Sequence, residues 1–160
     1  MQLFIVRHAP AEELSGSYSD ADRELTSKGR KLFREFALKL IKPDQAPQLI
    51  LHSPLVRAVQ TAEILREVIG LDREQMRVDS RLSPGMSATR LASVSQGLTE
   101  SRIAVVGHNP DVSQCASQLI GGGSIDFKKG SMACIDFFDD VTPGLGRLLW
   151  FMSPKQMVTD

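Results

Sequence analysis

Short apolar runs recur at intervals along the chain. Residues 3–6, 49–51 and 103–106 are continuously apolar, and residues 76–78 form a weaker run. A continuous apolar run, in contrast to an alternating one, is typical of a strand that is covered on both faces in a parallel sheet. The pattern therefore predicts parallel strands at these four places.

Helical periodicity fills the intervals between the runs. From residue 32 to residue 41 apolar side chains recur at spacings of three and four, and Thr26 is placed to cap the start of this helix. A second helix is expected to open with Ser53 as N-cap and Pro54 at the first helical position, and to end at Gly70. Shorter helices are predicted over residues 88–96 and 111–120.

The C-terminal part of the chain has a different pattern. Residues 132–138 and 147–152 are predicted strands joined by a turn rich in proline and glycine, which adds an antiparallel pairing. The earlier alternation of strand and helix implies right-handed crossovers and helices on both faces of the sheet. We therefore expect an α/β fold: a three-layer α/β/α sandwich with a mainly parallel central sheet and a C-terminal antiparallel pair. No linker interrupts residues 1–160, which are expected to form a single domain.

Composition narrows the class of protein. Nineteen Lys and Arg balance nineteen Asp and Glu, and the shares of hydrophobic (42%) and charged (24%) residues are near the average of soluble globular chains. Zero net charge disfavours partnership with nucleic acid or with an anionic membrane surface. Cys115 and Cys134 are too few and too distant for a disulfide framework or a zinc site, and the run at residues 3–6 is too short for an export signal, so we expect a cytoplasmic protein.

Arginine and histidine side chains follow three of the predicted strands. Arg7 and His8 come directly after the first apolar run, and Arg57 lies shortly after the second. His108 and Asn109 follow the run at residues 103–106. Ligands of open parallel sheets bind beyond the carboxyl ends of the strands, so these side chains are expected to converge on one edge of the sheet.

This combination of residue types suits a phosphoryl group. Arginine presents a planar fork of donors that matches phosphate oxygens, and a helix that begins near Ser53 would add free N–H groups. A neutral imidazole can attack phosphorus, and a protonated one can stabilise the charge of the transferring group. Neighbouring guanidinium cations oppose a divalent ion, so we expect neither a metal nor another cofactor.

The motifs that carry these residues resemble the histidine phosphatase superfamily, which includes the phosphoglycerate mutases. They are Arg7-His8 after the first strand, SPLVRAVQTAE over residues 53–63 and Gly107-His108-Asn109 after a late strand. The short chain, with DRELTSKG over residues 22–29 and WFMSP over residues 150–154, is similar to the SixA-type phosphohistidine phosphatase branch. The resemblance covers nearly the whole chain and implies a phosphoglycerate mutase-like fold.

The resemblance also implies a role for each site residue. His8 would be the nucleophile that becomes transiently phosphorylated, and Arg7 and Arg57 would hold the phosphate oxygens. His108 would stabilise the transition state as a hydrogen-bond donor. Further substrate contacts are expected from Asn109, Arg23 and Ser53. These roles agree with the chemistry of the residues, because positioning and charge stabilisation are the main contributions of a protein to phosphoryl transfer.

Two positions depart from the family pattern. Ala9 stands where a glycine usually follows the histidine, and Arg81 lies in the region where mutase-like branches carry an acid. An alkoxide leaving group, with a parent pKa of roughly 15, needs a proton donor, whereas imidazole, with a pKa of about 6.5, departs with little help. The missing acid therefore favours a phosphohistidine substrate. Asp20 and Asp22, on the loop over residues 11–24, are the candidate proton donors.

The leading hypothesis is a phosphohistidine phosphatase that acts on a protein partner, such as a histidine phosphotransfer domain of a signalling or sugar-uptake relay. A small-molecule phosphomonoesterase of the same superfamily is the alternative with the same chemistry. A non-catalytic phosphate-binding module is the alternative from another class. A receiver-like module would need an acidic cluster after the first strand, where this chain has Arg7 and His8.

Overall fold

The structure is a computed structural model that describes residues 1–16 and 18–158, and its centre is one six-stranded sheet. The strand order is β3-β2-β4-β1-β5-β6. The strands are β1 (Gln2–Arg7), β2 (Leu49–His52), β3 (Met76–Val78), β4 (Arg102–Gly107), β5 (Met132–Asp136) and β6 (Arg147–Met152). The first four are mutually parallel, while β5 runs antiparallel to β1 and β6 antiparallel to β5. The expected mainly parallel sheet with a C-terminal antiparallel pair is confirmed.

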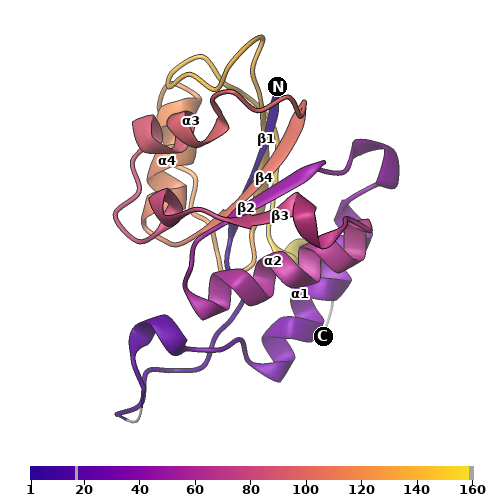
Figure 1. Cartoon of the computed structure of the whole chain (residues 1–160), viewed down its shortest axis with the longest axis vertical. Helices are drawn as coiled ribbons and strands as arrows, with labels where there is room; N and C mark the ends of the chain where they lie inside the picture. Colours follow the sequence, from indigo (N-terminus) through magenta and orange to yellow (C-terminus); the bar gives the residue numbers. More distant parts are fainter. Residues whose placement is uncertain (17, 159–160) are drawn as a thin grey trace.

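Helices cover both faces of this sheet (Figure 1). The longer helices are α1 (Ser27–Leu40), α2 (Val56–Ile69), α3 (Ala88–Ser95) and α4 (Asp111–Leu119), followed by the short α5 (Pro154–Met157). Single 3-10 turns are η1 (Asp20–Asp22), η2 (Pro43–Gln45), η3 (Arg73–Gln75) and η4 (Ser80–Leu82). No helix in the described part of the chain is long and apolar enough to span a bilayer.

Two cores hold the layers together, one on each face of the sheet. Phe33 and Phe36 of α1 pack with apolar residues of α2 against one face, and Leu91 of α3 and Leu119 of α4 pack against the other. All four side chains are almost completely buried. The inner strands β1, β2 and β4 are buried on both faces because each face has its own helices, which explains their continuous apolar runs, whereas the edge strands β3 and β6 are partly exposed.

The start of the second helix differs from the sequence prediction. The helix begins at Val56 with Leu55 as its cap residue, so the assignment of Ser53 as N-cap and Pro54 as first helical residue is wrong. The chain leaves the sheet edge after His52 and needs three residues to turn into the helix. The hydroxyl of Ser53, which a cap would direct to the helix, lies instead 2.7 Å from a histidine nitrogen described below. The predicted end is confirmed, because Gly70 closes the helix in a left-handed conformation.

The loop between β1 and α1 is tied to the rest of the fold at its base. Ala11 forms an isolated bridge with Leu25, and the side chain of Thr26 caps α1 by accepting the N–H of Gly29, as predicted. Residue 17 of the predicted loop lies outside the described residues. The loop therefore extends from a fixed base at the carboxyl end of β1.

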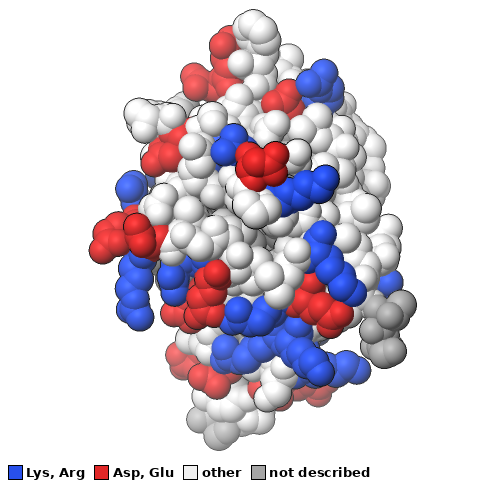
Figure 2. All heavy atoms as spheres, turned by 90° about the vertical axis from the view of Figure 1, so that its right-hand side faces the viewer, with Lys and Arg blue, Asp and Glu red and all other residues white. Residues whose placement is uncertain are grey.

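Charged side chains of both signs lie on the face of the molecule that Figure 2 shows. Figure 2 shows basic and acidic side chains next to one another across one face of the molecule. Ion pairs such as Lys39–Glu35, at 3.0 Å, join residues of opposite sign on the helices. On this face, side chains of opposite charge therefore lie close to one another.

Candidate active site

The predicted site residues meet at the carboxyl ends of three neighbouring strands. Arg7 ends β1, and the β1–β4 register pairs it with Gly107, the residue before His108. His8 and His108 therefore lie side by side, with ring centroids 5.4 Å apart. Arg57, in the first turn of α2, joins them, and its side chain, like both imidazoles, is buried. The convergence expected from the strand ends is present.

His8 is held in one tautomer. Its Nδ1 lies 2.7 Å from the carbonyl oxygen of Ala9, and a carbonyl can only accept, so Nδ1 carries the proton. The ring is neutral, because burial first, and then the charges of His108, Arg57 and Arg7, lower its pKa to about 3 despite the opposing bond to Ala9. A neutral ring protonated on Nδ1 leaves the lone pair on Nε2 as a nucleophile.

Arg7 and Asn109 share one backbone anchor. The carbonyl oxygen of Phe127 accepts Arg7 Nη1 at 2.7 Å and the side-chain amide of Asn109 at 3.0 Å. The amide oxygen of Asn109 also accepts the hydroxyl of Ser113 at 2.9 Å. The amide of Asn109 thus holds the segment that positions Arg7. Nothing in the sequence marks Phe127, because its contribution is a main-chain oxygen.

Arg57 is oriented by the loop between β1 and α1. Its Nη1 donates to the main-chain oxygen of Asp20 at 2.7 Å, and its Nη2 to the carboxylate of Asp20 at 3.1 Å. Arg23 binds the other carboxylate oxygen of Asp20 at 2.9 Å. Burial raises the pKa of Asp20, but the charges and hydrogen bonds of the two arginines outweigh it and hold the pKa below its usual value. Asp20 and Arg23 therefore form a charged rim beside Arg57.

The two candidate proton donors are placed differently. Asp20 faces the site and is held ionised by its pairing with Arg57, whereas the carboxylate of Asp22 accepts the hydroxyl of Ser19 at 2.6 Å on the exposed side of the loop. Arg81, where the sequence lacks the family's acid, pairs with Asp79. The described residues contain no group of three or more His, Cys, Asp or Glu that could hold a metal ion.

Ser53 and Thr61 support the site from behind. Ser53 is fully buried, with its hydroxyl 2.7 Å from Nε2 of His108. Thr61 accepts the main-chain N–H of Ala9 at 3.0 Å and donates to the carbonyl of Arg57 at 2.7 Å, so it links the nucleophile's strand to α2. Sequence reasoning included Thr61 only as a letter of a motif and gave it no role.

Unpartnered polar atoms gather at this site. Among the described residues, four buried side-chain nitrogen or oxygen atoms have no hydrogen-bond partner: Nε of Arg7, Nε of Arg57, Nδ1 of His108 and Oγ of Ser131. Three of these four belong to the cluster around His8. Buried donors without acceptors cost free energy unless a ligand satisfies them. Two guanidinium N–H groups and an imidazole nitrogen are the partners that an oxyanion requires.

The pKa of His108 is also depressed. Burial contributes most, followed by the charge of Arg57, and together with Arg23 and Arg7 they lower the pKa to about 4 against the opposing effect of Asp20. An influence of Arg23 on His108 places this arginine within electrostatic range of the site. The imidazole pair is thus neutral near pH 7, while the charge of the site comes from arginine.

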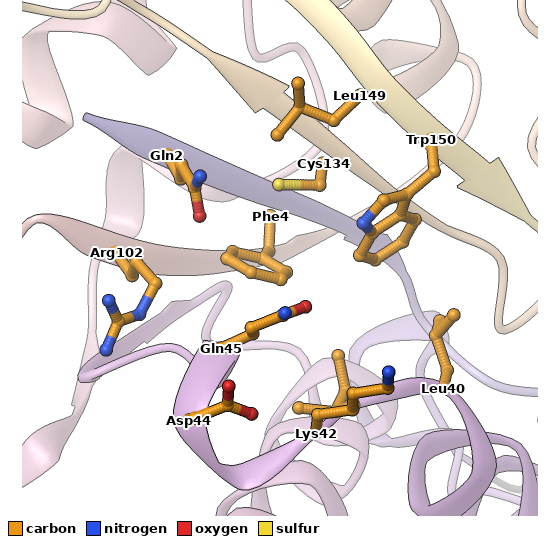
Figure 3. A pocket seen from close by; sticks show the side chains of 11 residues that line it. Gln2, Phe4, Leu40, Lys42, Asp44, Gln45, Arg102, Cys134, Leu149 and Trp150 are labelled. Atoms are coloured by element: carbon orange, nitrogen blue, oxygen red, sulfur yellow. The ribbon is translucent and has the colours of Figure 1, made fainter.

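A separate pocket of about 400 Å³ lies at the other end of the sheet. Figure 3 shows the rings of Phe4 and Trp150 beside it, near the start of β1 and β4. Lys42, Asp44 and Arg102 contribute charged groups of both signs. None of the buried, unpartnered atoms found in the described chain belongs to this pocket, so it lacks the feature that marks the histidine cluster as a candidate anion site.

Comparison with known proteins agrees with this geometry. The sequence profile of the histidine phosphatase superfamily (branch 1) matches residues 3–84, which is half of the chain. The chain belongs to the histidine phosphatase superfamily. The matched segment contains Arg7, His8 and Arg57, and the protein is a phosphatase by this membership.

Relatives extend the match of this histidine phosphatase beyond that segment. It is 29% identical over 158 residues to the phosphohistidine phosphatase SixA of Escherichia coli K12, covering 96% of this chain and 94% of SixA. It is 32% identical over 126 residues to an uncharacterized protein of Picosynechococcus, covering 76% and 74% of the two chains. A solved structure of the protein histidine phosphatase SixA complexed with tungstate superposes with a TM-score of 0.86 at 28% identity, over 99% of this chain and 100% of that one. The expected phosphoglycerate mutase-like fold is confirmed.

Proposed function

We propose that residues 1–160 act as one histidine phosphatase domain that removes phosphate from a histidine of a protein partner, with His8 as nucleophile. The observation that carries the proposal is the free Nε2 of His8 beside three buried nitrogen atoms that lack a partner. A phosphoryl group seated there would give acceptors to Arg7, Arg57 and His108 together. The charge that a metal ion supplies in other phosphatases would come from the two guanidinium groups.

The reaction follows from these positions in two steps. Nε2 of His8 forms a bond to phosphorus as the bond between phosphorus and the substrate imidazole breaks. The substrate ring is protonated on its other nitrogen, so the leaving nitrogen keeps the electron pair of the broken bond as the lone pair of a neutral imidazole. A water molecule then attacks the phosphorylated His8, which releases inorganic phosphate and restores the lone pair on Nε2. The hydrogen bond from Nδ1 to Ala9 stabilises the positive ring during the first step.

The preference for phosphohistidine rests on the state of the nearest carboxyl. Asp20 is ionised through its contacts with Arg57 and Arg23, so it holds no proton to give to a departing alkoxide. Imidazole, with a pKa of about 6.5, needs no such donor. The similarity to SixA of Escherichia coli, named a phosphohistidine phosphatase, supports the same substrate class.

The partner follows from the substrate. Phosphohistidine occurs on phosphotransfer proteins, so we propose that the enzyme acts on a histidine phosphotransfer domain or a similar carrier in a cytoplasmic signal-transduction or sugar-uptake relay. The exposed carboxylate of Asp20, which is half accessible, places the rim of the site at the surface, where a histidine of another protein can approach.

Trapping of the intermediate tests the nucleophile. Wild-type protein incubated with ³²P-labelled phosphoramidate should carry acid-labile, base-stable label, and His8→Ala should carry none. His52→Asn is the matched control, because His52 is a similarly buried histidine at the end of β2, which is separated from β1 by β4, and this variant should still be labelled. Equal labelling of wild type and His8→Ala would refute the assignment.

Substrate comparison tests the leaving group. The kcat/KM for a phosphorylated histidine phosphotransfer domain should exceed that for sugar phosphates and phosphoserine, and EDTA should leave both rates unchanged. A clear preference for the esters would instead establish a small-molecule phosphomonoesterase. Absence of turnover on either class, with tight phosphate binding, would indicate a phosphate-binding module.

A further inference from the structure

Ser53 and His108 follow adjacent strands and meet behind the site. The register of β2 with β4 pairs His52 with Val106, so the chain segments that leave the two strands are neighbours. The Ser53 hydroxyl and Nε2 of His108 are 2.7 Å apart, with 0% and 4% of the two residues exposed. Water therefore has little access to either group, and their hydrogen bonds have to be made within the protein.

The Ser53 hydroxyl carries one hydrogen, which needs a hydrogen-bond acceptor. Its oxygen already accepts the main-chain N–H of Leu55 at 3.3 Å. Among the described residues, its only other hydrogen-bond partner is Nε2 of His108, which is therefore the acceptor for the hydroxyl hydrogen. If Nε2 carried the proton instead, the hydroxyl hydrogen would be buried without an acceptor. Satisfying both groups requires a proton on Nδ1 of His108.

That nitrogen is the one left unpartnered. Nδ1 of His108 is buried and makes no hydrogen bond within the described chain. Its ring lies 5.4 Å from that of His8, on which the phosphoryl group would be carried. A lone pair at this place would repel an oxyanion, whereas an N–H would bind it.

We propose that Ser53 is a positioning residue that fixes His108 as the Nδ1–H tautomer, so that the neutral imidazole donates a hydrogen bond to the phosphoryl oxygen. The identity of the acceptor rests on the proposed function, but the tautomer follows from the hydrogen bonds of the free protein. His108 then serves as a donor without gaining a proton, because the hydroxyl of Ser53 determines which nitrogen carries the existing one. In this role Ser53 acts through His108.

Nitrogen-15 NMR of the free protein tests the tautomer directly. The chain contains three histidines, so the ring signals of His108 can be assigned by comparison with His108→Asn. At pH 7 the wild-type ring should show a protonated Nδ1 and an acceptor Nε2. A proton on Nε2 of His108 would overturn the proposal, and this measurement requires no variant of Ser53 to fold.

Substitution of Ser53 tests the consequence for catalysis. Ser53→Ala should leave KM within about twofold and lower kcat roughly 10–100-fold, since one preorganised donor of the site loses its orientation. The same variant should show a mixture of His108 tautomers. Ser53→Thr, which keeps the hydroxyl, should restore the Nδ1–H form and most of the rate. If Ser53→Ala keeps a pure Nδ1–H tautomer, Ser53 does not determine it.

Ser95→Ala is the matched control. Ser95, in α3, is also buried, and its hydroxyl donates to the main-chain oxygen of Ala92 within the same helix, so its removal should change neither kcat nor the tautomer of His108. The outcomes separate the two proposals. Failure of His8 trapping refutes the proposed function and leaves the tautomer to be judged by NMR. Normal trapping with a proton on Nε2 of His108 refutes only the role of Ser53.

Discussion

Gly29 is the position where a single methyl group should disturb both stability and catalysis. An ideal Cβ there would lie 2.3 Å from the carbonyl oxygen of Pro10 and 2.9 Å from Oγ1 of Thr26. A normal carbon–oxygen contact is at least about 3.3 Å, so α1 or the Pro10 segment has to move by about 1 Å. Both groups are already committed, because Pro10 accepts the N–H of Thr26 and Thr26 caps Gly29.

The expected magnitude combines two opposing effects. Overpacking costs about 1–3 kcal/mol, and replacing glycine by alanine within a helix returns up to about 1 kcal/mol. We expect Gly29→Ala to lower the free energy of unfolding by about 1–2 kcal/mol, which for a chain of this size is a fall in Tm of about 2–8 °C. Because Pro10 follows the residue whose carbonyl holds His8, a shift of this size should also lower kcat roughly 10–100-fold.

Thermal unfolding followed by circular dichroism, together with steady-state kinetics, measures both effects. Gly16→Ala is the control, because a Cβ at Gly16 meets no atom within 4 Å, and its free energy of unfolding should stay within about 0.5 kcal/mol of wild type. If Gly29→Ala melts at or above the wild-type temperature and retains its kcat, the close approach of α1 to Pro10 does not position His8.

Three further predictions concern charge and protonation. The pKa of histidine is about 6.5 in the unfolded chain and about 3 for folded His8, so the unfolded chain binds more protons between these pH values. The free energy of unfolding therefore falls as the pH falls through this window, by about 2 kcal/mol at pH 5. Urea unfolding should show a smaller change in this free energy between pH 7 and pH 5 for His8→Asn than for wild type, and an equal change would contradict the depressed pKa. Asp20→Asn removes a negative charge 3.1 Å from Arg57 that competes with phosphate for this arginine, so it should tighten inhibition by inorganic phosphate several-fold. Asp22→Asn should not change this inhibition. Equal inhibition constants for the two variants would argue against competition between Asp20 and phosphate. Both cysteines are buried free thiols whose pKa burial raises to about 12, so iodoacetamide at pH 8 should label them only in denaturant, and labelling of the native protein would show that they are accessible.

The error at the second helix shows how one sequence signal can serve two purposes. Ser53-Pro54 has the composition of a helix start, and local propensity alone favours that interpretation. In the structure the hydroxyl of Ser53 is directed to His108, which is 55 positions away in sequence, and the helix begins at Val56. A contact between residues so far apart cannot be read from a local pattern, so the sequence indicated a helix cap and a substrate contact for Ser53 but not a hydrogen bond to His108.

The sequence by itself determined the elements and the composition of the site. Continuous apolar runs marked the parallel strands because a strand covered on both faces has no polar side, and residues directly after such strands had to lie at one sheet edge. Arg7, His8, Arg57 and His108 could be named on that basis, and the family resemblance followed from the same motifs.

Only the tertiary structure decided how these residues are held. The strand order places β4 between β2 and β1, which sets the end of β4 beside both Ser53 and His8. The supports of the nucleophile and of the arginines are the main-chain oxygens of Ala9, Phe127 and Asp20, and every residue type carries such an oxygen. Neither composition nor sequence motifs indicate where these oxygen atoms lie. Their positions, and therefore the tautomers and charges that prepare the site for an oxyanion, exist only once the chain has folded.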